Sequence, residues 1–112
     1  MEAFPLKFEV SVPSKEELES NIQEMEEDAK EHPENAQYFE IKKEMFEADL
    51  AVLDDPKNAG VDPNTLAGAE DLSSQMDRAT KGLSQEAAKL LQQDPSLYKY
   101  GWQMLGRHWI TV

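Results

Sequence analysis

Apolar and polar residues alternate strictly at the start of the chain, which predicts a half-buried β-strand over residues 4–12. The apolar side of this strand holds Phe4, Leu6, Phe8, Val10 and Val12. The last residues, 107–112, are aromatic and β-branched, and they predict a second strand. We expect the two terminal strands to pair with each other or with a partner. A two-stranded ribbon is marginally stable by itself, and packing against the helices would stabilise it.

Between these ends the apolar residues recur at intervals of three and four, which predicts amphipathic helices. Ser14 and Glu17 have the spacing of a capping box and predict the start of the first helix. Pro33 ends it, because proline removes a backbone donor. Its apolar stripe is thin and consists of Leu18, Ile22, Met25 and Ala29.

The second predicted helix, residues 34–53, is richer in apolar residues and carries two neighbouring stripes. One stripe holds Tyr38, Ile41, Met45, Ala48 and Val52, and the other holds Phe39, Phe46, Leu50 and Leu53. Such a broad apolar face predicts contacts on two sides, so we expect this helix to be central to the fold.

A proline- and glycine-rich loop then leads to a third predicted helix, with Asp62 as its N-cap and Gly82 as its end. Small residues at 67–69 permit a close backbone approach. Ser84 begins a short fourth helix, and residues 96–106 are compatible with another short one. The predicted fold is mainly α, a single domain over 1–112 with three to four amphipathic helices and short terminal β-strands.

The composition fits one small domain. The chain has 112 residues, of which 39% are hydrophobic, and no cysteine, so disulfides and thiolate sites are excluded. The start "MEAFPLKFEV" lacks the features of a secretory signal, and no run approaches the ~18 apolar residues of a membrane span. We expect an intracellular, soluble protein, of a cell, a virus-infected cell or a virion.

The net charge of −12 is concentrated in one half of the chain. Residues 1–55 hold seventeen acids and five lysines, whereas residues 56–112 hold six acids and six bases. The acidic face of the first helix comprises Glu16, Glu19, Glu24, Glu26, Glu27 and Glu31. A charge run is usually a solvated face, and the alternative is contact with a basic protein surface. Direct nucleic-acid binding is not expected, because carboxylates repel phosphates.

No catalytic template matches the chain. It has no glycine-rich phosphate loop, no Gly-x-Ser-x-Gly motif and only two histidines. Glu27, Glu31 and His32 have a spacing that could share a divalent ion, but the Glu-x-x-His pattern of di-iron bundles is missing because position 29 is alanine. We therefore expect no enzyme, no cofactor and no metal site, with a carboxylate metal site as a distant alternative.

The tail "LYKYGWQMLGRHWITV" concentrates aromatic residues. Tryptophan, tyrosine and arginine dominate binding hot spots, so the candidate partner-binding residues are Tyr98, Tyr100, Trp102, Arg107 and Trp109. Some of them are equally suited to the core, and we expect a division between core and interface. Stacking on nucleic-acid bases is a weaker alternative in a chain this acidic.

These patterns favour a small non-enzymatic protein that binds another protein or copies of itself, as a structural subunit or adaptor of a larger assembly. A virion component of the phage connector or tail-completion type has this general profile, by analogy of class only. The alternative is an acidic inhibitor that mimics nucleic acid and blocks a basic cleft on a target protein.

Overall fold

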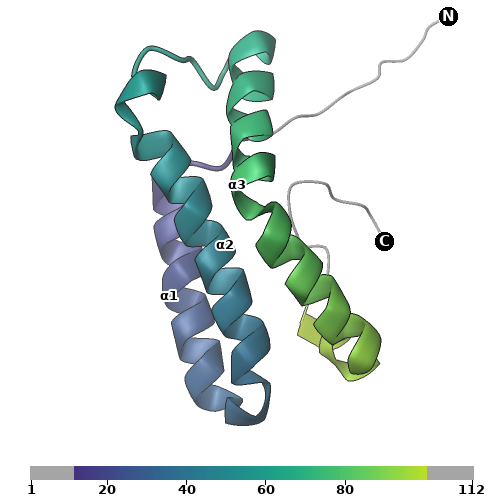
Figure 1. The fold of residues 1–112 in the computed structure, drawn as a ribbon. Helices are drawn as coiled ribbons and strands as arrows, with labels where there is room; N and C mark the ends of the chain where they lie inside the picture. The colour runs from purple at the N-terminus through teal and green to yellow at the C-terminus, as the bar shows by residue number, and fades with distance from the viewer. Residues whose placement is uncertain (1–11, 101–112) are drawn as a thin grey trace, which may run out of the picture.

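A computed structural model describes residues 12–100, and these form three α-helices linked by short 3-10 turns (Figure 1). The helices are α1 (Lys15–Glu31), α2 (Ala36–Asp54) and α3 (Leu66–Gln93). The 3-10 turns are η1 (Pro33–Asn35), η2 (Pro56–Asn58) and η3 (Pro95–Tyr100). The prediction of a mainly helical chain is therefore confirmed.

The predicted combination of helices with β-strands is wrong, since residues 12–100 contain no strand. The predicted strand segments 4–12 and 107–112 lie outside the described residues, apart from Val12. Val12 belongs to no strand and lies two residues before the cap of α1. An alternating pattern shows only that one side of a segment is apolar, whereas a strand also needs a neighbour that pairs with its backbone. In the described chain the backbone hydrogen bonds are formed within helices and turns instead.

The predicted start of α1 is confirmed. The Ser14 hydroxyl accepts a hydrogen bond from the Glu17 amide at 3.1 Å, and the Glu17 carboxylate accepts one from the Ser14 amide at 3.0 Å. The helix ends at Glu31, where the His32 amide donates to the carbonyl of Asp28 at 2.8 Å. The reciprocal cap formed by Ser14 and Glu17 satisfies two backbone N–H groups that would otherwise have no partner within the helix.

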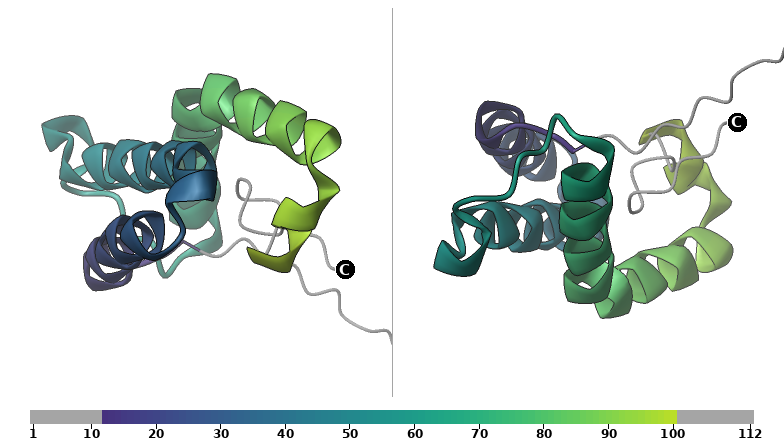
Figure 2. Two further views of the ribbon diagram at one scale, coloured as in Figure 1. Left: turned by 90° about the horizontal axis from the view of Figure 1, so that it is seen from below. Right: turned by 90° about the horizontal axis from the view of Figure 1, so that it is seen from above.

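α2 is the central helix, as the two stripes predicted, and it packs between α1 and α3 (Figure 1). The core takes Leu18 and Met25 from α1, Ala87 and Leu91 from α3, Leu97 from η3, and Tyr38, Phe39, Ile41, Met45 and Phe46 from α2. The end-on views in Figure 2 show the α1–α2 pair on one side and the C-terminal part of α3 with η3 on the other.

α3 is one continuous helix, so the predicted end at Gly82 and the predicted new start at Ser84 are wrong. Glycine inside a helix costs about 1 kcal/mol, and the burial of Ala87 and Leu91, further along the same helix, outweighs that cost. The helix bends near its middle (Figure 1). Thr80, which is buried there, donates its hydroxyl hydrogen bond to the Met76 carbonyl at 2.9 Å, a contact that bends helices. Beyond α3, the described part of the predicted helix 96–106 is the 3-10 turn η3.

The loop before α3 closes on the helix that follows it. Thr65, rather than the predicted Asp62, is the N-cap, and its hydroxyl accepts a bond from the Gly68 amide at 3.0 Å. The Thr65 hydroxyl also donates to the carbonyl of Asp62 at 3.0 Å, which brings the loop over the first turn of α3. A Cβ at Gly68 would overlap that carbonyl and lie 2.9 Å from the Thr65 hydroxyl. The predicted close backbone approach is therefore confirmed at Gly68.

Candidate interaction surfaces

The acidic face lies on the side of α1 opposite its buried stripe, and its edges come close to α2 at Glu24 and Glu26. Its six residues, Glu16, Glu19, Glu24, Glu26, Glu27 and Glu31, are all exposed. Because successive helical residues turn by about 100°, they fall within an arc of about 160° opposite the buried stripe. The buried stripe is anchored by Leu18 and Met25, which are 1% and 5% exposed.

Few positive groups neutralise this face. The Glu26 carboxylate lies 3.0 Å from the Lys43 ammonium of α2, and this hydrogen bond raises the pKa of Lys43. Of the other five glutamates, Glu24 attracts the buried Lys42, and Glu16 and Glu19 attract Lys15 without forming its strongest contact. Lys15, at the start of the helix, is held instead by Asp54 of α2 at 2.7 Å, which raises its pKa. The face therefore keeps most of its negative charge and presents it to solvent.

Two charged residues of α2 are buried, and the apolar pattern of the sequence predicted the burial of neither. Lys42 is 1% exposed and Asp49 is 4% exposed. Burial lowers the pKa of Lys42 to about 8, against the attraction of Asp28 and Glu24 on α1, which raises it. The Lys42 ammonium lies 5.1 Å from the centre of the Tyr38 ring, where a cation is attracted by the ring face.

A sequence signal for the burial of Lys42 does exist. Lys42 follows Tyr38 by four residues, and Asp49 follows Lys42 by seven, so helical spacing places all three on the same side of α2 as core aromatic residues. The signal is weak, because a lysine beside an apolar stripe usually extends its amine into water.

The metal-site alternative finds no support in the part of the chain that the structure describes. His32 lies near Glu31 and Glu34, with each imidazole nitrogen 3.8 Å from a carboxylate oxygen. No group of three or more histidine, aspartate or glutamate residues within 12–100 is arranged to hold a metal ion. Glu27 does not join His32 in such a group.

The tail reaches the core through its first residue, Leu97. Tyr98 and Tyr100 lie in the 3-10 turn η3. Leu97, which directly precedes Tyr98, is 3% exposed and packs in the core cluster. The remaining candidates, Trp102, Arg107 and Trp109, lie outside the described residues. The structure therefore brings the start of the tail to the helices and leaves its predicted partner-binding role as a prediction.

No helix in residues 12–100 is long and apolar enough to cross a membrane. The chain matches no protein-family model, and it has no significant similarity to any curated protein or solved structure.

Proposed function

We propose that this protein is a small non-enzymatic interaction subunit, acting as a structural component or adaptor of a larger assembly, and that the acidic face of α1 binds a basic surface on its partner. The observation that carries this proposal is the placement of six exposed glutamates opposite the buried stripe of one helix. The same face holds one exposed lysine, Lys30, so it is predominantly rather than wholly negative. A face with such an excess of one sign is suited to attract a basic surface.

The scaffold supports this use of α1 because it holds the helix firmly. The capping box fixes the start of the helix, and the Lys15–Asp54 and Lys43–Glu26 pairs connect it to α2 at two places. A rigid array of charges binds without first losing conformational freedom. Since exposed charges act mainly on encounter, we expect fast association that slows as salt is added.

The test compares two double charge reversals with the same change in net charge. Glu19→Lys/Glu27→Lys changes the acidic face, and Glu70→Lys/Glu86→Lys changes exposed positions on α3. Each variant and the wild-type chain are used to recover partners from the native source, and the association rate with each recovered partner is measured. We expect the first variant to associate at least tenfold more slowly and the second to match the wild type. Equal rates for both variants would remove the α1 face from the interaction.

The nucleic-acid mimic is the second candidate, and the spacing of charge on α1 supports it. The acidic face extends about 22 Å along the helix axis, so the mean axial spacing of its charges is about 4.5 Å, comparable with the ~3.4 Å per phosphate of one DNA strand. Competition distinguishes the two functions. A mimic is displaced from its partner when DNA or RNA is added. An adaptor stays bound to its partner whether or not nucleic acid is present.

A further inference from the structure

A second surface feature lies on α2 and α3, away from the acidic face. These helices and η2 enclose a shallow groove of about 340 Å³, to which α1 contributes no residue. The groove is lined by Ala48, Ala51, Val52, Asp55, Lys57, Gln75, Arg78 and Ala79. Its apolar floor consists of small side chains from two adjacent helices. Small side chains allow another helix to approach closely, since interaxial distances of about 8 Å require them.

The walls of the groove are fixed by hydrogen bonds. Asn58 of η2, which is 7% exposed, and Gln75 of α3 bond to each other through both amide groups, at 2.9 and 3.0 Å. Asn58 also donates to the Val52 carbonyl at the end of α2, at 2.8 Å. These bonds join α2, η2 and α3, so the groove is already formed in the free protein. A partner that binds there therefore loses little affinity to the ordering of these elements.

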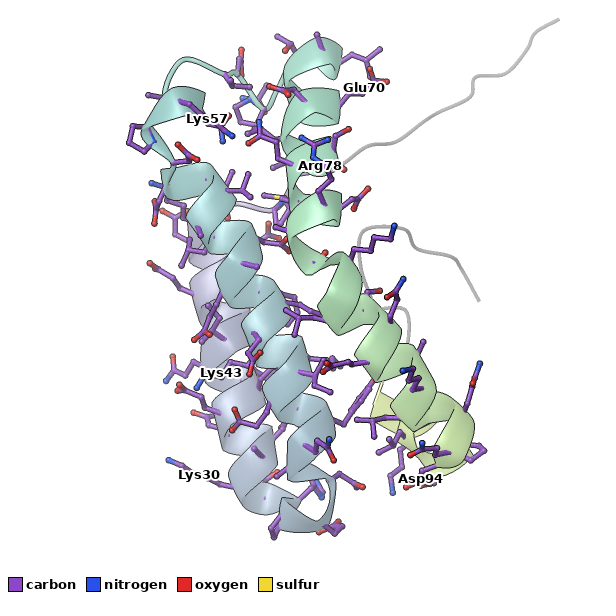
Figure 3. All side chains as sticks on the ribbon, in the orientation of Figure 1. Lys30, Lys43, Lys57, Glu70, Arg78 and Asp94 are labelled. Atoms are coloured by element: carbon purple, nitrogen blue, oxygen red, sulfur yellow. The ribbon has the colours of Figure 1, made fainter. Side chains whose placement is uncertain are left out.

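The lining of the groove has more bases than acids, Lys57 and Arg78 against Asp55, in a chain that is otherwise acidic. Residues 12–100 contain 21 acids and nine bases, and two of those bases, Lys57 and Arg78, line this groove. Figure 3 shows them on η2 and α3, at the end of the molecule where these two elements face each other. Arg78 forms no ion pair among the described residues, and the Lys57 ammonium lies 4.0 Å from Asp55, the one acid of the lining.

We propose that this groove binds an acidic amphipathic helix of a partner protein. The apolar side of that helix rests on the alanine floor, and its carboxylates lie against Lys57 and Arg78. This is the helix-in-groove mode of recognition, with charge complementarity at the rim choosing the partner. The inference rests on the proposed function in one respect, that the protein acts by binding other proteins. It adds a second binding surface, which prefers an acidic partner, whereas the α1 face prefers a basic one.

The test measures fluorescence anisotropy of a labelled helical peptide of 18 residues, with alanine and leucine on one side and glutamate on both flanks, titrated with the intact chain. We expect the double variant Lys57→Glu/Arg78→Glu to weaken binding at least tenfold. Ala51→Trp, which fills the floor without changing charge, should weaken binding to a similar extent. Lys81→Glu/Lys89→Glu is the matched control, because it makes the same charge change at exposed sites of α3 outside the groove, and it should bind as the wild type does.

Several results would overturn the proposal. A peptide with lysine in place of each glutamate should not bind; equal binding of both peptides, or no effect of the Lys57/Arg78 reversal, contradicts it. A wild-type dimer in sedimentation that the Lys57/Arg78 reversal disperses would show that a second copy occupies the groove instead. Glu19→Lys/Glu27→Lys should leave peptide binding intact, so failure at the groove and failure at the α1 face are measured separately. Circular dichroism checks that each variant is folded.

Discussion

α1 and α2 are both charged helices of similar length, with 17 and 19 residues, yet they place their charges in opposite ways. α1 turns six glutamates to solvent and buries only a narrow apolar stripe. α2 lies between two helices and buries a lysine and an aspartate among its aromatic residues. The difference shows that neighbours, and not composition, decide whether a charge is solvated. It also separates an outer helix, for which we propose a binding role, from a central helix that supplies most of the core residues.

The largest expected effect comes from reversing the buried charge of α2. Lys42→Glu places a carboxylate beside Asp28 and Glu24, in a site that already disfavours any charge. We expect the free energy of unfolding to fall by about 4 kcal/mol in denaturant titrations. Lys30→Glu makes the same change at an exposed position of α1 and should shift it by no more than ~0.5 kcal/mol. Similar losses in both variants would break the contrast between the helices.

The pH dependence of stability sharpens the contrast. The folded-state pKa of Lys42 is about 8, below its ordinary value of 10.5, so the unfolded chain binds more protons between these pH values. The penalty for burying the lysine is therefore complete below pH 8 and is relieved as the pH rises to 10.5. We expect the stability of the wild type relative to Lys42→Met to increase by roughly 3 kcal/mol over this range.

The matched control for that measurement is Lys43→Met, one residue further along α2. The hydrogen bond with Glu26 raises the pKa of Lys43, so its contribution is present below pH 10.5 and is lost only as the pH rises further. The stability of the wild type relative to Lys43→Met should therefore stay constant between pH 8 and 10. A rise equal to that seen with Lys42→Met would contradict the assignment of the effect to the buried lysine.

The same dependence on surroundings holds for two glycines of α3. Gly68→Ala forces a methyl group against the Asp62 carbonyl and should reduce stability by about 2 kcal/mol or more. Gly82→Ala meets nothing within 4 Å inside a helix, so it should increase stability by about 0.5–1 kcal/mol. Thermal unfolding of the two variants measures whether each change in stability is positive or negative. A stabilising Gly68→Ala would disprove the close approach of the loop.

The smallest effect is expected at the exposed ion pair between α1 and α2. A double-mutant cycle with Glu26→Gln and Lys43→Met should show a marginal coupling that disappears at 1 M salt, where the screening length is about 3 Å. A coupling that persists at high salt would show that this pair contributes to stability beyond surface attraction.

Local patterns in the sequence predicted much of the helical part of the chain. The capping box at Ser14 and Glu17, the two stripes of α2 and the close approach at Gly68 all depend on residues a few positions apart. Such features follow from the geometry of a helix and its caps, which repeats every turn. The same local reasoning failed at Gly82, because a glycine ends a helix only where no packing energy carries the helix through it.

Tertiary structure alone decided which polar groups are buried and where a groove forms. Lys42 is buried because α1 and α2 come together around it, and the groove exists because Asn58 and Gln75, 17 residues apart, bond across two elements. The acidic residues of α1 are evident in the sequence, and helical spacing alone predicts that they lie on the side of the helix opposite its buried stripe. The burial of a charge and the shape of a groove depend instead on side chains distant in sequence, whose approach no local spacing determines.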